Sequence, residues 1–159
     1  MEKITSFTVN HLKLLTGVYV SRKDYLKGDV LTTFDLRFTR PNYEEVMDTA
    51  SIHALEHLGA TFLRNDEQWG KKIIYFGPMG CRTGFYLIIV GDLESLDIIP
   101  LLQRMINFIL QYEGDIPGAK EIECGNFRDS DLNGAKRYAQ KFLNEVLINP
   151  SYNRLNYPL

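Results

Sequence analysis

The sequence predicts an α+β protein, with helices packed on one face of an antiparallel sheet and a single domain over residues 1–159. Two observations lead to this class. Four short segments rich in β-branched and aromatic residues come in two pairs, each joined by a short turn. Three longer segments repeat apolar residues with a helical period and alternate with or follow the strands. The length of 159 residues suits one domain with one core.

The first predicted pair of strands comprises residues 18–26 and 29–38, in which apolar residues alternate with polar ones. The segment "LKGD" between them indicates a hairpin turn. The second pair comprises residues 72–77 and 84–91, separated by the loop "PMGCRT". Both strands of this pair are mostly apolar, which suggests that neighbouring elements cover both of their faces.

The first predicted helix covers residues 43–64, where apolar side chains form a wide stripe, and the dipeptide "PN" before it can start the helix. The second begins near Ile98 or Ile99, because Pro100 fits in the first turn of a helix. It ends at Gly114, a residue type that commonly terminates helices.

The third predicted helix extends to residue 147 and has Asp129 or Ser130 as its N-cap. The segment that follows, residues 149–159, is rich in proline and asparagine. This composition predicts turns and a loosely ordered tail.

The composition argues against several classes of partner. The net charge is −2 and there is no basic block, so neither nucleic acid nor an anionic membrane is expected as a main partner. No apolar run approaches the roughly 20 residues of a membrane span, and the first residues lack the apolar core of a secretory signal. We therefore expect a cytoplasmic protein, in which Cys81 and Cys124 are free thiols, metal ligands or catalysts rather than a disulfide.

The pentapeptide "HALEH" places two of the three histidines, His53 and His57, four residues apart on the first predicted helix. Residues at this spacing share a helix face, so the two imidazoles can bind one divalent metal ion. Glu56 lies beside that face and is placed to shuttle protons. The alternative is an amphipathic helix with two polar histidines. The apolar neighbours favour a site, because unpaired imidazoles are costly among them.

The third ligand of such a metal remains open from the residues alone. Cys124 would complete a His₂Cys set with an open fourth position, as in catalytic sites. Glu121 or Glu123 would instead complete the His₂Glu set of an inverted zinc protease. A free cysteine is by default a small buried core residue, so Cys124 also has a purely structural interpretation.

Cys81 lies in the glycine-containing loop "GPMGCRTGF" between two predicted strands. Such a loop lets the backbone approach a ligand closely. Arg82 follows directly, and a nearby cation would lower the pKa of the thiol and favour the thiolate. A tight turn that happens to hold a cysteine is the alternative.

Five segments in order give the chain a specific resemblance. "SFTVNH", "FDLRFTRPN", "HALEHLGA", "GPMGCRTGFY" and "ECGNF" are similar in sequence and spacing to segments of the S-ribosylhomocysteine lyase (LuxS) family. The resemblance runs from about Ser6 to Lys136, most of the chain, and covers the single domain. It gives a role to all three histidines and both cysteines.

The resemblance implies a bacterial carbon–sulfur lyase of the cytoplasm. Such an enzyme converts S-ribosylhomocysteine to homocysteine and 4,5-dihydroxy-2,3-pentanedione, the precursor of the quorum-sensing signal autoinducer-2, through two carbonyl migrations and a β-elimination. It also implies a homodimer whose active sites lie at the subunit interface. The implied cofactor is Fe(II), one per subunit, which zinc or cobalt can replace.

The resemblance also implies roles for particular residues. It makes His53, His57 and Cys124 the metal ligands, and Glu56 and Cys81 the acid–base residues. Three further residues match substrate-contacting positions: Ser6, His11 and Arg37. The charge and shape of Arg37 suit the carboxylate of homocysteine, but it could equally lower the pKa of the Cys81 thiol.

The sequence departs from the family pattern at two positions. Tyr75 stands where many members carry an aspartate, which puts any polar role of that aspartate in doubt. Ser130 stands where many members carry a histidine shortly after the third ligand. The expected ligand set is unchanged, but the hydrogen bonds around it are expected to differ.

Overall fold

The computed structural model describes residues 2–158, and its strands form one antiparallel sheet in the order β1-β2-β4-β3. The four strands are β1 (Gly17–Leu26), β2 (Asp29–Arg37), β3 (Ile73–Pro78) and β4 (Gly84–Val90). Both predicted hairpins are present, and the first turns at Lys27 and Gly28. Both turn residues have positive φ, 47° and 95°, which matches the right-handed twist of a two-residue hairpin.

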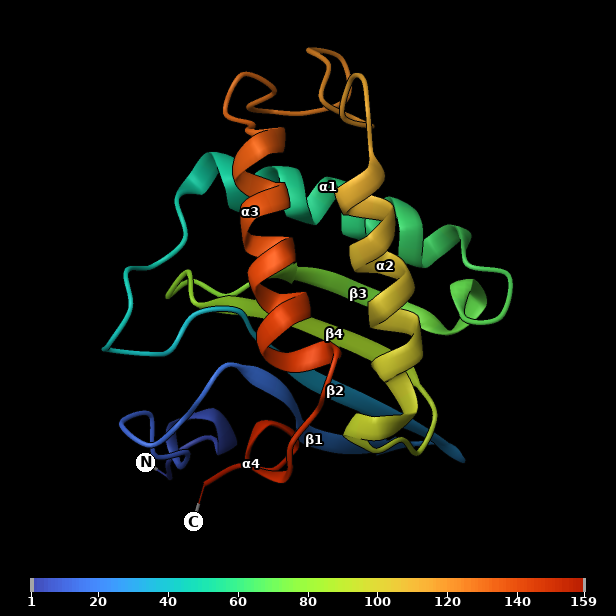
Figure 1. Ribbon diagram of the computed structural model, residues 1–159. Helices are drawn as coiled ribbons and strands as arrows, with labels where there is room; N and C mark the ends of the chain where they lie inside the picture. The colour runs from blue at the N-terminus through green and yellow to red at the C-terminus, as the bar shows by residue number, and fades with distance from the viewer. Residues whose placement is uncertain (1, 159) are drawn as a thin grey trace.

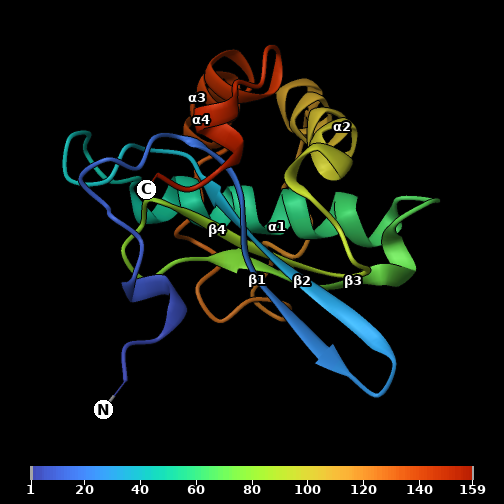
Figure 2. The ribbon, with the colours of Figure 1, turned by 90° about the horizontal axis from the view of Figure 1, so that it is seen from below.

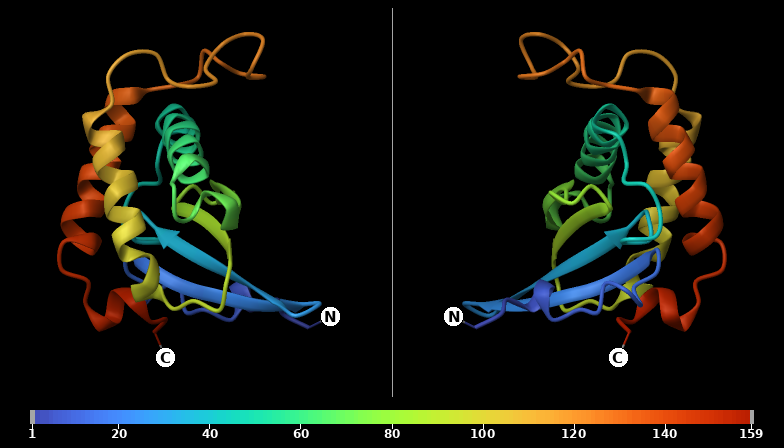
Figure 3. Two further views of the ribbon diagram at one scale, coloured as in Figure 1. Left: turned by 90° about the vertical axis from the view of Figure 1, so that its right-hand side faces the viewer. Right: turned by 90° about the vertical axis from the view of Figure 1, so that its left-hand side faces the viewer.

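The main helices are α1 (Thr49–Asn65), α2 (Ile99–Gln111) and α3 (Leu132–Phe142), the last continued by a π-helical turn at Leu143–Leu147. The short helices are Thr5–Phe7, Gly70–Lys72, Ser95–Ile98 and α4 (Tyr152–Leu155). Figures 1 and 3 show α1, α2 and α3 on one side of the sheet, and Figure 2 shows the β1–β2 hairpin extending beyond them. The predicted α+β class is confirmed. None of the helices among residues 2–158 has both the length and the apolar character needed to cross a membrane.

The first helix begins at Thr49, so the predicted start at residue 43 is wrong. Asp48 is the N-cap, and its carboxylate accepts a hydrogen bond from the backbone N–H of Ser51 at 2.8 Å. The segment before it is held instead to the loop between β3 and β4, where the Met47 N–H donates to the Arg82 carbonyl. The cap therefore fixes where the helix that carries the two histidines begins.

The other helix ends also differ from the predictions. Pro100 lies in the first turn of α2 as predicted, but this helix ends at Gln111 rather than Gly114. The N-cap of α3 is Asp131, not Asp129 or Ser130, and its side chain accepts from the Gly134 N–H at 3.0 Å. The backbone N–H of Asp131 also donates to the Ala50 carbonyl of α1, so a tertiary contact selects the cap.

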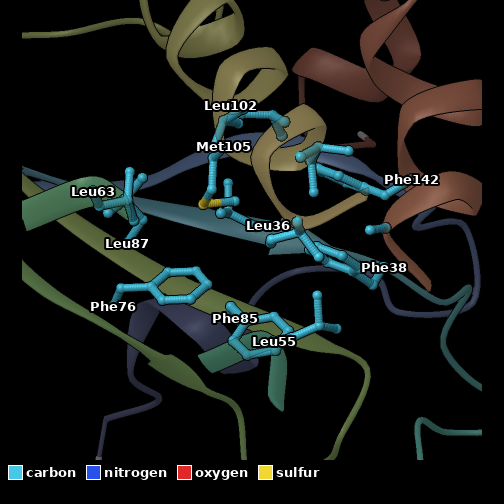
Figure 4. Packing of buried hydrophobic residues seen from close by; sticks show 14 of the residues in the cluster. Leu36, Phe38, Leu55, Leu63, Phe76, Phe85, Leu87, Leu102, Met105 and Phe142 are labelled. Carbon is cyan, nitrogen blue, oxygen red and sulfur yellow. The ribbon is translucent and has the colours of Figure 1, made fainter. Parts of the chain in front are cut away.

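The core lies between the sheet and the three main helices (Figure 4). Phe38 stacks on Phe142 of α3 with ring centroids 4.1 Å apart, and Phe76 of β3 stacks on Phe85 of β4 at 5.0 Å. Gly59 lets α1 approach β3 closely, because a Cβ atom there would lie 2.5 Å from the Phe76 ring. This contact thereby sets the distance between α1 and the sheet, and with it the position of the side chains on α1.

Within the single chain, the second face of the sheet is covered only in part among the described residues, and the predicted cover of both faces is not met at β3. Ile74 and Tyr75 are 46% and 48% exposed. In β2, Asp35 and Arg37 alternate with the core residues Phe34 and Leu36 and therefore lie on this second face, yet both are buried.

The C-terminal tail, residues 149–158, is ordered against β1, which contradicts the predicted loose order. Arg154 donates to the carbonyl of Thr16 at 2.9 Å, and the Tyr19 hydroxyl donates to the carbonyl of Asn153 at 3.1 Å. The ring of Tyr157 stacks on that of Tyr19, with centroids 4.8 Å apart. These contacts join residues from opposite ends of the chain, which local composition does not reveal.

Candidate active site

Helix α1 presents His53 and His57 on one face, one turn apart, with ring centroids 4.6 Å apart. The apolar side of the helix, which includes Leu55 and Leu58, is buried against the core. Both histidines therefore lie at the border between core and surface and are half-buried. This placement agrees with the shared face predicted from their spacing.

The long loop between α2 and α3 brings Cys124 to these histidines (Figure 1, orange). The Cys124 sulfur lies 3.3 Å from Nε2 of His53. One ligand atom from each of the three residues lies within 4.8 Å of the others, so the group could hold a metal ion. We call His53, His57 and Cys124 the histidine group. Glu121 and Glu123 are exposed and are not part of this group. Of the alternatives open from sequence, the structure therefore favours Cys124.

Two backbone carbonyls orient the imidazoles. Nδ1 of His53 lies 2.7 Å from the Asp129 carbonyl oxygen, and Nδ1 of His57 lies 2.8 Å from that of Pro117. A carbonyl only accepts, so each Nδ1 carries a hydrogen, and Nε2 is the ring nitrogen left to bind a metal ion. Two imidazoles and a cysteine sulfur in this arrangement fit a divalent transition metal ion, with the carbonyls fixing the rings.

Gly118 permits the approach of this loop to His57. Its φ is +72°, and a Cβ atom there would lie 3.0 Å from Nδ1 of His57. A larger residue would be strained in this backbone conformation and would press on the imidazole. The glycine is thus part of how the chain builds the group.

Glu56 is half-buried beside the metal-binding group. Its carboxylate oxygen lies 3.6 Å from Nε2 of His57, the nitrogen that faces the group. It is not one of the three grouped ligands. The acid–base role expected for Glu56 remains a prediction.

The loop between β3 and β4 exposes Cys81 at a tight turn. The Arg82 N–H donates to the Met79 carbonyl at 2.9 Å, and Arg82 adopts a left-handed conformation with φ 59°. The cation at the thiol, however, is Arg37 of β2, whose Nη1 lies 3.9 Å from the sulfur. The Thr83 hydroxyl lies 3.1 Å from the same sulfur. Sequence proximity pointed to Arg82, whereas the fold supplies Arg37, in agreement with the alternative role predicted for that residue.

These contacts lower the pKa of the Cys81 thiol. Partial burial raises the pKa, but the hydrogen bond with Thr83 and the positive charge of Arg37 together outweigh it. The exposed sulfur is therefore biased toward the thiolate, the nucleophilic and basic form. Cys124, by contrast, belongs to the histidine group.

A buried ion pair holds Arg37 in place. Its Nε donates to Oδ1 of Asp35 at 3.0 Å and its Nη2 donates to Oδ2 at 2.5 Å, and both side chains are 3% exposed. Its Nη1 donates to the Thr83 hydroxyl at 2.6 Å. The Tyr157 hydroxyl donates to Oδ2 of Asp35 at 2.9 Å. We call these five residues the thiol network: Cys81, Thr83, Arg37, Asp35 and Tyr157.

Sequence reasoning missed three members of the thiol network. Asp35 is two residues from Arg37 on the same face of a strand, a spacing that could have indicated the pair. Thr83 is two residues from Cys81, but a threonine in a loop carries no signal of its own. Tyr157 reaches the network only because the tail folds back.

Ser6 and His11 lie in the N-terminal segment. Ser6 lines a cavity of about 280 Å³ on the second face of the sheet, together with Tyr75 and Tyr86. Nδ1 of His11 lies 2.9 Å from the Val9 carbonyl. Neither residue belongs to the histidine group or makes a hydrogen bond to the thiol network.

The two departures from the expected pattern have different surroundings. Tyr75 lines the same cavity as Ser6. Ser130 lies next to Asp129, whose backbone carbonyl orients His53. A main-chain group therefore does the orienting, and it does not depend on the side chain at position 130.

The histidine group and the thiol network are separate within one chain. Among residues 2–158, no hydrogen bond or ion pair joins a member of one to a member of the other. The thiol network lies on the second face of the sheet, whereas α1 lies on the helical face.

Comparisons with known proteins agree on one family. The family model described as S-ribosylhomocysteinase (LuxS) matches residues 4–153. The S-ribosylhomocysteine lyase of Clostridium beijerinckii is 58% identical over 158 residues, and that of Finegoldia magna is 59% identical, each alignment covering 99% of both chains. The S-ribosylhomocysteine lyase of Borreliella burgdorferi is 50% identical, with 99% of this chain and 100% of the relative covered.

Proposed function

Because the chain belongs to the S-ribosylhomocysteinase (LuxS) family, it is an S-ribosylhomocysteine lyase, and we propose that it acts through one metal ion and one thiolate. The products are homocysteine and 4,5-dihydroxy-2,3-pentanedione, the autoinducer-2 precursor. The observation that carries this proposal is the separation of two thiols into two roles. Cys124 lies beside two histidines with which it could bind a metal ion, whereas Cys81 lies beside the guanidinium of Arg37.

His53, His57 and Cys124 are the proposed metal ligands, with one Fe(II) per subunit that zinc or cobalt can replace. The orientation of both rings by backbone carbonyls through Nδ1, and the sulfur beside Nε2 of His53, support this assignment. A set of three protein ligands leaves a coordination position open, which is typical of catalytic sites. When bound, the metal acts as a Lewis acid that stabilises negative charge on the sugar oxygens.

Cys81 is the proposed base at the sugar carbons. Its thiolate removes a proton from one carbon, and the resulting thiol returns a proton to the neighbouring carbon, which moves the carbonyl by one position. Two such migrations place the carbonyl two carbons from the carbon–sulfur bond. Removal of the proton between them then expels the homocysteine thiolate, and no other reactant is consumed.

Glu56 is the proposed proton relay among the sugar oxygens. Each carbonyl migration requires one hydroxyl to lose its proton and the former carbonyl oxygen to gain one. A half-buried carboxylate beside the ligand His57 is well placed to carry that proton. Its role differs from that of Cys81, which acts at carbon.

Ser6, His11 and Arg37 are the proposed substrate-contacting residues. The cavity beside Ser6 supports a place for part of the substrate on the second face of the sheet. Arg37 is 3% exposed and already donates to Asp35 and Thr83. Because the Arg37 side chain already makes these hydrogen bonds, stabilisation of the Cys81 thiolate is favoured as its role over binding of the homocysteine carboxylate.

We further propose a homodimer whose active sites each combine the histidine group of one subunit with the thiol network of its partner. One substrate must reach both, yet within one chain they lie on different sides of the sheet. The exposed Ile74 and Tyr75 give the second face an apolar surface that a second copy would bury. We place the enzyme in the cytoplasm, where both thiols stay reduced.

The shared site can be tested with mixed dimers. Cys81→Ala and His57→Ala variants are each expected to be inactive. A heterodimer of the two, purified through two different affinity tags, has one site with both defects and one with neither, so about half of the wild-type activity should return. A heterodimer without activity would show that the two groups act within the same chain.

The lyase reaction itself is tested by homocysteine release. Fe(II)-loaded protein is incubated with S-ribosylhomocysteine, and new thiol is measured with a thiol reagent. A reaction without substrate corrects for the two protein thiols. Failure of the loaded protein to release homocysteine would refute the proposed reaction.

A further inference from the structure

Tyr157, in the C-terminal tail, is the member of the thiol network farthest from the sulfur along its hydrogen bonds. The ring of Tyr157 lies flat against Tyr19, with an interplanar angle of 10°, and its hydroxyl donates to Oδ2 of Asp35 at 2.9 Å. The same oxygen accepts from Nη2 of Arg37. A continuous set of contacts thus runs from the tail through Asp35 and Arg37 to the Cys81 sulfur.

Asp35 is almost fully buried, with 2% of its surface exposed. A buried carboxylate needs several donors to offset the loss of water, and each lost donor leaves its charge less compensated. Arg37 supplies two donors and Tyr157 supplies a third. The phenol therefore helps to compensate the negative charge of Asp35, which the guanidinium would otherwise compensate alone.

We propose that Tyr157 is a positioning residue, whose hydroxyl holds the Asp35–Arg37 pair so that the guanidinium faces the Cys81 sulfur. The C-terminal tail thereby tunes the reactivity of the base. This inference rests on the proposed role of Cys81. Without the hydroxyl, Asp35 draws more strongly on Arg37, less positive potential reaches the sulfur, and the thiolate is less favoured.

The phenol remains a donor over the working pH range. Burial raises the pKa of Tyr157, and the charge of Asp35 and the hydrogen bond to it raise it further. Four other titratable groups act on the phenols and charges of this region: Tyr19, Tyr86, Arg22 and Arg154. Burial also raises the pKa of Tyr19, to about 12, and that of Tyr86, so neither titrates near neutral pH.

The tail is anchored independently of the Tyr157 hydroxyl. Arg154 donates to the Thr16 carbonyl, Tyr19 donates to the Asn153 carbonyl, and the Ser95 hydroxyl donates to the Leu155 carbonyl at 3.0 Å. A change from Tyr157 to phenylalanine keeps the stacked ring and these anchors. It removes the hydrogen bond that the hydroxyl donates to Asp35, together with the contact of the hydroxyl with Ser21.

The experiment measures the rate at which iodoacetamide alkylates Cys81, as a function of pH, in metal-free and substrate-free protein. Peptide mass spectrometry separates Cys81 from Cys124. In Tyr157→Phe the profile should shift to higher pH, with alkylation at neutral pH slower by about two- to fivefold. Tyr152→Phe is the matched control, because Tyr152 lies in the same tail and is 76% exposed. Its profile should match the wild type.

A double variant tests the route of the effect. In an Asp35→Asn, Arg37→Gln background, adding Tyr157→Phe should change the profile no further, because the charges through which the hydroxyl acts are gone. An unshifted profile for Tyr157→Phe overturns the inference, including when its melting temperature falls, since that result shows a purely structural role. The alkylation requires no turnover, so its outcome is independent of the lyase assay.

Discussion

Nη1 of Arg37 lies 3.9 Å from the sulfur of Cys81, at the end of a guanidinium that Asp35 holds on its other side. A strand of the sheet thus supplies the charge for a thiol that sits in a loop. The sulfur is exposed and reachable, whereas the cation is buried and fixed. An accessible thiol beside a fixed cation suits the role proposed for Cys81, which must contact the substrate and react as a thiolate.

Removal of the cation should weaken the base. Arg37→Gln, made together with Asp35→Asn so that no charge is left buried alone, is expected to raise the pKa of the Cys81 thiol. Because thiolate is the reactive form, alkylation at neutral pH should slow by up to about tenfold for each pKa unit. Rates measured at high pH, where every variant is a thiolate, serve as the control. Equal rates at neutral pH would mean that Arg37 does not act on the sulfur.

The hydroxyl of Thr83 should contribute separately. Thr83→Val removes the contacts to the sulfur and to Arg37, at about 1 kcal/mol for a typical hydrogen bond. The pKa of Cys81 should rise, and the pH profile of alkylation should move upward. Thr83→Ser retains the hydroxyl and should stay close to the wild type. If valine and serine behave alike, the threonine serves packing only.

Gly118 should matter for metal affinity. Gly118→Ala introduces a Cβ 3.0 Å from Nδ1 of His57 in a backbone conformation that alanine resists. Displacement of an orienting contact typically weakens metal binding about 10- to 100-fold, which competition with a chelator measures. Gly125→Ala is the control, because a Cβ there meets nothing within 4 Å. Equal affinities in the two variants would contradict the proposed role of the loop.

Gly59 should matter for stability. A Cβ at this position would lie 2.5 Å from the Phe76 ring, so Gly59→Ala overpacks the contact between α1 and β3. Such overpacking typically costs about 1–3 kcal/mol, and the midpoint of urea unfolding should fall accordingly. Gly80→Ala, with open space around the new atom, should leave the midpoint nearly unchanged. A more stable Gly59→Ala variant would show that α1 can move away at no cost.

Local pattern was sufficient for the hairpins and for the pairing of His53 with His57. Alternation and a short turn determine strand pairing, and a helical spacing determines which side chains share a face. Cys124 could not be separated from Glu121 or Glu123, because the choice depends on how the loop after α2 folds onto α1. Neither of the predicted caps of the third helix, Asp129 and Ser130, was correct, because one backbone contact to Ala50 places the cap at Asp131.

The thiol network was the least predictable part. Its cation and its carboxylate come from β2, its phenol comes from the tail, and its thiol comes from the loop between β3 and β4, so the network joins three separate segments of the chain. The composition of the tail indicated turns, and the structure forms one short helix there, Tyr152–Leu155. It could not indicate that Arg154 and Tyr157 would find partners on and beside β1.

The separation of the two thiols is tested most directly by measuring bound metal and turnover in the same two variants. Cys81→Ala should keep its metal and lose homocysteine release, whereas Cys124→Ala should lose the metal and, with it, the activity. Circular dichroism confirms that both remain folded. Metal that leaves with Cys81 and stays without Cys124 would contradict the account.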